Sequence, residues 1–221
     1  MSNASLSPST NTPMGYYTSA MRKLMLAVLA AVVAVALWWR KNPSACPYNQ
    51  RFWVQAPHPL ITRARLREAL APRPGERMLE VGPGTGYYSL PVAEWLGPSG
   101  TLEIFDLQQE MLDHTSARAR EAGLGNVVAT QGDARSLPYG NDAFAGAFLV
   151  TVLGEVPDQE AALRELARVV RPSGRVVVGE LMGDPHWVSP AALGRRAEAA
   201  GLRLERRIGS PLGYFAVLRP A

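Results

Sequence analysis

Hydrophobic and polar positions divide the 221 residues into two unlike parts. Residues 24–39 form a run of sixteen side chains (LMLAVLAAVVAVALWW) bracketed by the basic pairs Arg22-Lys23 and Arg40-Lys41. From residue 77 onward, short β-rich runs alternate with stretches of helical periodicity. This pattern predicts one apolar helix followed by a folded domain that contains both strands and helices.

Seven runs in the second part are typical of strands, namely Met78–Val81, Thr101–Phe105, Asn126–Gln131, Phe144–Val150, Arg175–Glu180, Arg203–Ile208 and Tyr214–Arg219. Helical stretches separate the first five, which predicts a parallel sheet with helices on both faces. The link between the last two is too short for a crossover helix, so those strands should be antiparallel. We therefore expect an α/β fold with a seven-stranded, mostly parallel sheet, an antiparallel last strand and one preceding transmembrane helix. Gly123 and Gly174 stand where helix ends or turns favour a positive φ.

The composition predicts a buried core, because 47% of the residues are hydrophobic and only 19% are charged. A single cysteine, Cys46, excludes an internal disulfide framework and a cysteine-cluster metal site. The three histidines are scattered without the spacing of zinc ligands, so no metal is expected.

Charge is distributed unevenly along the chain. Residues 1–70 contain eight Arg or Lys against one acid, Glu68, for a net charge of +7. Residues 71–221 contain fifteen Arg against eighteen Asp or Glu, for a net charge of −3. A folded domain of negative net charge argues against nucleic acid as a partner. The basic N-terminal part favours a negatively charged membrane surface, so membrane lipids are expected partners.

The apolar run favours a membrane anchor and sets the expected division of the chain. Residues 1–20 should be a disordered tail, 21–43 a transmembrane anchor, 44–70 a juxtamembrane neck with a lead-in helix, and 71–221 the folded domain. Sixteen helical residues are about 24 Å long. Basic side chains at both ends, with Trp38-Trp39 and Tyr16-Tyr17 at the headgroups, can bridge the remaining thickness of the bilayer. More Arg and Lys follow the run than precede it, which predicts a single-pass protein whose domain faces the cytoplasm.

Three other interpretations of the run are disfavoured. A cleaved signal peptide needs small residues after the apolar run, whereas this run ends in Trp-Trp-Arg-Lys-Asn-Pro. A lipoprotein site at Cys46 is separated from the run by Pro43 and the basic pair. A buried core helix would be apolar on one stripe, whereas here apolar residues cover every face. The sequence leaves open whether the helix spans the bilayer or lies in its interface.

A glycine-rich loop after the first strand predicts a nucleoside pocket. The glycines fall at 82, 84 and 86 and Tyr87 follows, so the spacing differs from the G-x-G-x-x-G of dinucleotide-binding proteins. Asp106 ends the second strand, about 20 residues further on, where an acid can accept hydrogen bonds from ribose hydroxyls. Ligands of open α/β sheets bind at the carboxyl ends of the strands, where both features should lie.

Four successive motifs resemble those of class I S-adenosylmethionine (SAM)-dependent methyltransferases, and most of all the methyltransferase type 11 group that includes quinone-biosynthesis enzymes. They are Glu80-Val81-Gly82-Pro83-Gly84-Thr85-Gly86, Asp106, Gly132-Asp133-Ala134, and the segment from Leu166 to Gly174. They cover roughly residues 75–180 in the family's order. The resemblance implies a Rossmann-like fold, SAM as the cofactor and S-adenosylhomocysteine as its product.

The resemblance also assigns residues to the cofactor. The loop of Gly82, Gly84, Thr85 and Gly86 would wrap the methionine part, and Asp106 would bind the ribose. Asp133 and Ala134 would border the adenine, and Glu80 and Leu107 complete the cofactor-binding set that we expect. The Arg-Pro-Ser-Gly segment that ends at Gly174 is similar to a structural turn of the family before the fifth strand.

Candidate catalytic residues are Glu155 and His186. Glu155 follows the fourth strand, where it either faces the pocket as a substrate-amine ligand or base, or is an ordinary loop acid. His186 comes from a region that should cover the pocket mouth, although a lone histidine is more often an ordinary loop or core residue. Asp158 is expected to cap a helix. Methyl transfer depends mainly on alignment and exclusion of water, so a dedicated base is optional.

The sequence therefore predicts a membrane-anchored SAM-dependent methyltransferase that acts on a lipophilic small molecule, such as a lipid amine, a quinol or a thiol. One alternative is a membrane-tethered SAM-binding module without catalysis. Another is a nucleotide-sugar or nicotinamide enzyme on a similar sheet, which the spacing of the glycines disfavours.

Overall fold

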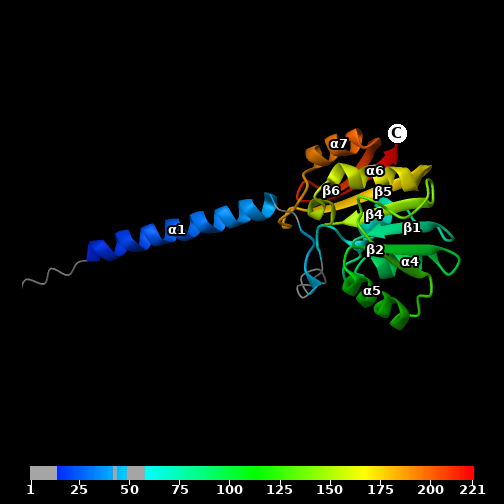
Figure 1. Cartoon of the computed structure of the whole chain (residues 1–221), viewed down its shortest axis with the longest axis horizontal. Coiled ribbons are helices and arrows are strands. Elements are labelled where there is room, and N and C mark those ends of the chain that lie inside the picture. The colour runs from blue at the N-terminus through cyan, green and yellow to red at the C-terminus, as the bar shows by residue number, and fades with distance from the viewer. Residues whose placement is uncertain (1–13, 42–43, 49–57) are drawn as a thin grey trace, which may run out of the picture. The chain divides into compact units, whose positions relative to one another are not determined.

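The computed structural model describes residues 14–41, 44–48 and 58–221, which belong to two compact units, 1–41 and 42–221 (Figure 1). The helices are α1 (Met14–Lys41), α3 (Arg63–Leu70), α4 (Ser89–Leu96), α5 (Gln109–Glu121), α6 (Gln159–Val169), α7 (Pro190–Ala199) and a short 3-10 helix, η2 (Leu153–Glu155). The strands are β1 (Arg77–Val81), β2 (Thr101–Asp106), β3 (Val127–Gln131), β4 (Phe144–Val150), β5 (Val170–Leu181), β6 (Leu202–Ser210) and β7 (Gly213–Pro220).

Helix α1 is 28 residues long and begins earlier than the sequence predicted. Residues 14–20 were expected in a disordered tail, but they are helical. Once a helix has nucleated, each further residue adds a hydrogen bond, so the apolar run can extend its helix into this polar stretch. Large apolar side chains of α1 are exposed, namely Met21, Leu24, Met25, Leu26, Val28, Leu29, Val32, Val33, Val35 and Trp38. Within the described ranges, we find no helix that combines the length and apolar character of a membrane span.

The folded unit is built on one seven-stranded sheet with the order β3-β2-β1-β4-β5-β7-β6. The strands from β3 to β5 in this order pair in parallel with one another. Strand β7 is antiparallel to both β5 and β6. The predicted seven-stranded sheet with an antiparallel last strand is therefore confirmed.

Each face of the sheet carries its own hydrophobic core. On one face, α6 and α7 pack with Leu163, Leu166 and Leu193 against residues of the central strands such as Val178. On the other face, α3, α4 and α5 pack against a second cluster that includes Phe148 of β4. Figure 1 shows α6 and α7 on one side of the sheet and α4 and α5 on the other.

The Asp158 cap is confirmed, because its carboxylate accepts a hydrogen bond from Ala161 N at 2.9 Å.

Strand β5 is longer than predicted, because the expected turn that ends at Gly174 lies inside it. The register with β4 shifts there, with Phe144 opposite Val170 and Gly146 opposite Arg175, so the intervening residues bulge. Gly123 has the expected positive φ of 72°, whereas Gly174 is not among the residues with positive φ. A Cβ at Gly174 would lie 2.5 Å from Val170 Cγ1. Gly174 is therefore required by close packing rather than by a left-handed turn.

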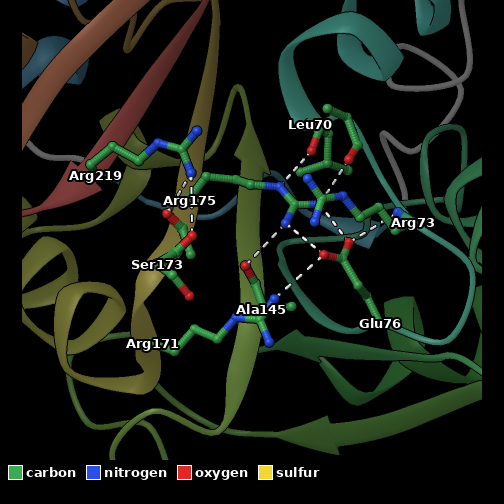
Figure 2. A network of polar contacts seen from close by, with 10 residues as sticks. Leu70, Arg73, Glu76, Ala145, Arg171, Ser173, Arg175 and Arg219 are labelled. Carbon is green, nitrogen blue, oxygen red and sulfur yellow. Dashed lines mark hydrogen bonds and ion pairs between the residues drawn. The ribbon is translucent and has the colours of Figure 1, made fainter.

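The edge of the sheet opposite the strands' carboxyl ends is held by a network around Arg175, shown in Figure 2. The Arg175 guanidinium donates from Nε to Leu70 O at 2.5 Å and from Nη2 to Ala71 O at 3.1 Å. It also donates from Nη1 to Ala145 O at 3.2 Å. One buried side chain of β5 thus fixes the end of α3 and the start of β4.

Candidate active site

The predicted site residues meet at the carboxyl edge of the sheet. Strands β2, β1 and β4 are consecutive neighbours, and all three point toward this edge because they are parallel. The glycine-rich loop follows β1, Asp106 ends β2, and Glu155 lies in η2 shortly after β4. Neighbouring parallel strands of this kind form the usual ligand crevice of an open α/β sheet.

The glycine-rich loop needs its glycines for both conformation and space. Gly82, Gly84 and Gly86 have φ values of 70°, 54° and 79°, which side chains strongly disfavour. A Cβ at Gly82 would lie 2.4 Å from Val152 Cγ2. Thr115 of α5 holds the loop by donating from Oγ1 to Gly84 O at 2.9 Å. The loop is therefore a preformed cradle in which the backbone can approach a ligand closely.

Glu80 is the penultimate residue of β1, two positions before the cradle begins, and is 2% exposed. Its Oε2 atom is buried and has no hydrogen-bond partner among the residues that the structure describes. Burial raises the pKa of Glu80 to about 8, and the nearby charge of Asp106 adds to the effect. A buried acceptor without a donor is suited to a ligand ammonium group, which the methionine part of SAM carries. The cradle and Glu80 thus fit the predicted cofactor.

Asp106 ends β2 with its carboxylate available at the same edge. Its Oδ1 accepts a hydrogen bond from Gln108 N at 2.8 Å. Burial raises the pKa of Asp106 to about 6, although hydrogen bonds from the backbone of Gln108 and Leu107 oppose this rise. The ionised carboxylate can accept hydrogen bonds from a ribose diol, and its contact with the ribose stays a prediction. Leu107, the next residue, is 58% exposed.

Asp133 and Ala134 follow β3, the neighbour of β2. Gly132 N donates to Asp106 O at 2.9 Å, which keeps the ends of the two strands together. The Asp133 carboxylate is engaged by Arg135, with Nη2 and Oδ2 2.6 Å apart, and the hydrogen bonds from Arg135 lower the Asp133 pKa. Ala134 is half-buried against the hydrophobic core. Their contact with the adenine stays a prediction.

Glu155 ends η2, which follows β4 at the carboxyl edge of the sheet, and the residue is half-buried. Burial raises its pKa to about 8, and the charge of Asp184 adds to this rise. A single described main-chain donor opposes the shift, because Cys46 N donates to Glu155 Oε2 at 3.2 Å. A carboxyl group with a pKa near 8 can exchange a proton at physiological pH, as a general acid or base must.

His186 lies in the loop after β5 and is 9% exposed. The main-chain N–H of His186 donates to Asp184 Oδ1 at 2.7 Å, and its main-chain carbonyl packs against Gly154 of η2. The packing is so close that a Cβ on Gly154 would lie 1.8 Å from His186 O. The structure therefore brings the loop that carries His186 against the turn that carries Glu155, although the two residues are 31 positions apart.

Sequence reasoning missed Glu180 and Asp184. Glu180 is the penultimate residue of β5 and is 1% exposed; its Oε2 accepts from Val188 N at 3.0 Å. Burial raises the pKa of Glu180 to about 8, and the charges of Asp184 and Glu155 add to the effect. The available signal was an acid at the carboxyl end of a strongly apolar predicted strand, which places its carboxylate at the ligand edge.

Comparison with known proteins identifies the fold and the family of the chain. The chain superposes on a SAM dependent methyltransferase from Aquifex aeolicus with a TM-score of 0.72 at 20% identity, over 79% of this chain and 98% of the other. The fold is therefore that of SAM-dependent methyltransferases. The model of the ubiE/COQ5 methyltransferase family matches residues 57–185. The chain belongs to this family of SAM-dependent methyltransferases, and SAM is its cofactor.

Two curated relatives match the central part of the chain. Nocamycin O-methyltransferase from Saccharothrix syringae is 38% identical over 114 residues, which are 51% of this chain and 40% of that protein. The ubiquinone/menaquinone biosynthesis C-methyltransferase UbiE from Vibrio vulnificus is 35% identical over 109 residues, which are 49% of this chain and 42% of that protein. The matches therefore span less than half the length of either relative.

Proposed function

We propose that this protein transfers the methyl group of SAM to a lipophilic, quinone-like small molecule. The observation that carries the proposal is the position of Glu155, a half-buried carboxyl group in the turn after β4, at the same sheet edge as the cofactor cradle. Family membership supports methyl transfer. The name of the Vibrio vulnificus relative assigns that protein to ubiquinone and menaquinone biosynthesis, which supports a quinone-like acceptor here.

The chemistry divides between the cofactor and the chain. When bound, SAM supplies a methyl group on a positively charged sulfur, and S-adenosylhomocysteine remains after transfer. The cradle, Glu80 and Asp106 hold and orient the cofactor, and the crevice excludes water from the reacting atoms. Glu155 accepts the proton that the acceptor loses as its new bond to the methyl group forms. His186 and Asp184 form the neighbouring wall, and a direct catalytic role of His186 stays a prediction.

A second part of the proposal concerns the membrane. Exposed apolar side chains along α1 support attachment of this helix to a lipid surface, with the basic residues beside it favouring the cytoplasmic face. Attachment would concentrate enzyme and lipophilic acceptor on one surface. Partitioning of the full chain between membrane and aqueous fractions tests this part. A chain lacking residues 1–43 should leave the membrane fraction, and unchanged partitioning would refute the attachment.

The activity is tested by transfer of labelled methyl from SAM into a host membrane extract, followed by separation into organic and aqueous phases. Asp106→Ala should abolish the label in the organic phase, because it removes the proposed ribose acceptor. Asp113→Ala is the matched control, because Asp113 is an exposed acid on α5 whose carboxylate contacts Gln109. A demethylated menaquinone in detergent serves as a defined acceptor in parallel.

The outcome separates the proposal from its main alternative. Label in the organic phase that depends on Asp106 supports a lipophilic acceptor. Label only in the aqueous phase would refute the lipophilic acceptor while keeping the methyltransferase. Cofactor binding without label in either phase, with extract and menaquinone alike, would favour a SAM-binding module without catalysis.

A further inference from the structure

A short segment far from the site in sequence lies against it in space. Residues 44–48, here called the strap, belong to the folded unit and run in extended or irregular conformation up to Tyr48. Cys46 N donates to Glu155 Oε2 at 3.2 Å, and Gln108 Nε2 donates to Cys46 O at 2.9 Å. The ring of Tyr48 packs edge-on against His114 of α5, with centroids 6.1 Å apart. The strap is therefore attached at several points.

These bonds connect two carboxylates of the site. Gln108 also donates its main-chain N–H to Asp106 Oδ1 at 2.8 Å. Glu155, Cys46, Gln108 and Asp106 thus form a continuous hydrogen-bonded chain from the end of β4 to the end of β2. Strand β1 lies between these two strands in the sheet, and the glycine-rich cradle follows β1. A link from the end of β2 to the end of β4 must therefore pass across the mouth of the cradle.

We propose that the strap closes the mouth of the active site and that the main-chain groups of Cys46 position Glu155 and Gln108 for methyl transfer. Cys46 is a positioning residue that acts through its peptide N–H and C=O. This inference rests on the proposed function, since it gives Glu155 the role of proton acceptor.

Electrostatics explain why Glu155 needs this donor. The titratable groups that interact with it are Asp184, Asp106, Glu180 and the Cys46 thiol. His186 lies in the loop that packs against Gly154, the residue before Glu155. The N–H of Cys46 stabilises the ionised form of Glu155 against burial and against the charge of Asp184. Without this bond the pKa of Glu155 would rise further, and less of the residue would be ionised at neutral pH. The strap thus prepares Glu155 to accept a proton.

Cys46→Pro in the full chain tests the positioning role, because proline has no main-chain N–H. A step that needs ionised Glu155 speeds up as pH rises through the pKa of this residue. In Cys46→Pro, the rising limb of the methyl-transfer rate plotted against pH should therefore lie about one pH unit higher than in the unmodified chain. Ala45→Pro is the matched control, because it adds a proline to the strap and leaves the Cys46 N–H in place. An unmoved limb in Cys46→Pro, or an equal shift in Ala45→Pro, would overturn the positioning role.

A second pair of variants tests the same link without changing the sequence of the strap. Gln108→Ala removes the side-chain donor to Cys46 O, whereas Gln109→Ala removes an exposed neighbour that contacts Asp113. We expect Gln108→Ala to raise the acceptor KM at least about fivefold, with the cofactor Kd changed less than about threefold. Gln109→Ala should leave both values at those of the unmodified chain. Equal effects of the two variants would contradict the proposal.

Alkylation gives a readout that does not require turnover. Cys46 is the single cysteine of the chain, so iodoacetamide reports on the strap alone. Saturating SAM should slow alkylation at least about fivefold, because a ligand beneath the strap limits its opening. An unchanged rate would overturn the placement of the strap over the site. Protection without methyl transfer to any acceptor would instead refute the proposed function and keep the strap.

Discussion

Glu76 and Arg175 form a double hydrogen bond between the loop before β1 and strand β5. Arg175 Nη1 lies 2.9 Å from Glu76 Oε1, and Nη2 lies 2.6 Å from Oε2 (Figure 2). Both side chains are 9% exposed. The pair is buried and bidentate, and the Arg175 guanidinium also donates to three carbonyl oxygens. Removal of Arg175 should therefore lower the free energy of unfolding far more than removal of a surface ion pair does.

Arg175→Ala should destabilise the fold by about 3–5 kcal/mol, because it leaves the Glu76 carboxylate buried without its main partner. Urea unfolding followed by circular dichroism measures the change. Arg164→Ala is the matched control, since Arg164 is an exposed residue of α6 that lies 3.9 Å from Glu160. Its effect should stay within about 0.5 kcal/mol. Similar losses in the two variants would refute the structural role of Arg175.

The same pair predicts a loss of stability in acid. Burial acts to raise the pKa of Glu76, but hydrogen bonds from Arg175 and Arg73 N outweigh it and hold the pKa below its usual value. A carboxyl group with a lowered folded-state pKa stabilises the fold above its unfolded pKa and loses this contribution as pH falls. Unfolding at pH 3 to 6 should therefore show a steeper loss in the unmodified chain than in Glu76→Gln. Parallel curves would contradict this origin of acid sensitivity.

Glu180→Gln should stabilise the fold at alkaline pH. Burial raises the pKa of Glu180 to about 8, so its contribution to stability is full below the unfolded pKa and is lost as pH rises toward 8. Glutamine keeps an acceptor for Val188 N without the charge. The variant should gain about 1–3 kcal/mol over the unmodified chain at pH 9 and little at pH 5. Thermal unfolding at pH 5 and at pH 9 measures the change in stability. Glu198→Gln is the control, because Glu198 is exposed and its replacement should give no pH-dependent gain.

Asp106→Asn should weaken SAM binding by about 10- to 100-fold at pH 7.5, the loss expected for one charged hydrogen-bond acceptor. Isothermal titration calorimetry gives the Kd, and Asp113→Asn serves as control. Because burial raises the pKa of Asp106 to about 6, the affinity of the unmodified chain should also fall as pH drops below 6. A pH-independent Kd between 5 and 8 would argue against Asp106 as the ribose acceptor.

Gly154→Ala should separate the two loops that carry Glu155 and His186. The new Cβ would lie 1.8 Å from a backbone oxygen that cannot rotate away, so the loops must shift, at a cost of about 1–3 kcal/mol. The acceptor kcat should fall while SAM binding is retained, since the cradle belongs to the loop after β1 and not to either of these loops. Gly194→Ala on α7 is the control, because no atom outside its own stretch of helix lies within 4 Å of the added Cβ. It should stabilise the helix by up to about 1 kcal/mol.

Local sequence patterns determined most of the fold and half of the site. The run Phe144–Val150 was predicted to the residue, and Asp158 was predicted as a cap from its place before a helical stretch. The cradle at Gly82 and the acid at Asp106 were found because both follow directly from the ends of predicted strands. Each of these features depends on residues close together in the chain, so periodicity and spacing reveal them.

Tertiary structure alone decided the rest. The segment before Gly174 has the composition of a turn, but pairing with β4 draws it into β5 as a bulge. Glu155, Glu180 and Cys46 share one environment only because the sheet order places the ends of β4 and β5 together and Cys46 N donates to Glu155 Oε2. Their raised pKa values arise from mutual burial and charge, which no local pattern encodes. The sequence by itself determined the elements and the cofactor; long-range packing decided which carboxylates meet beside it.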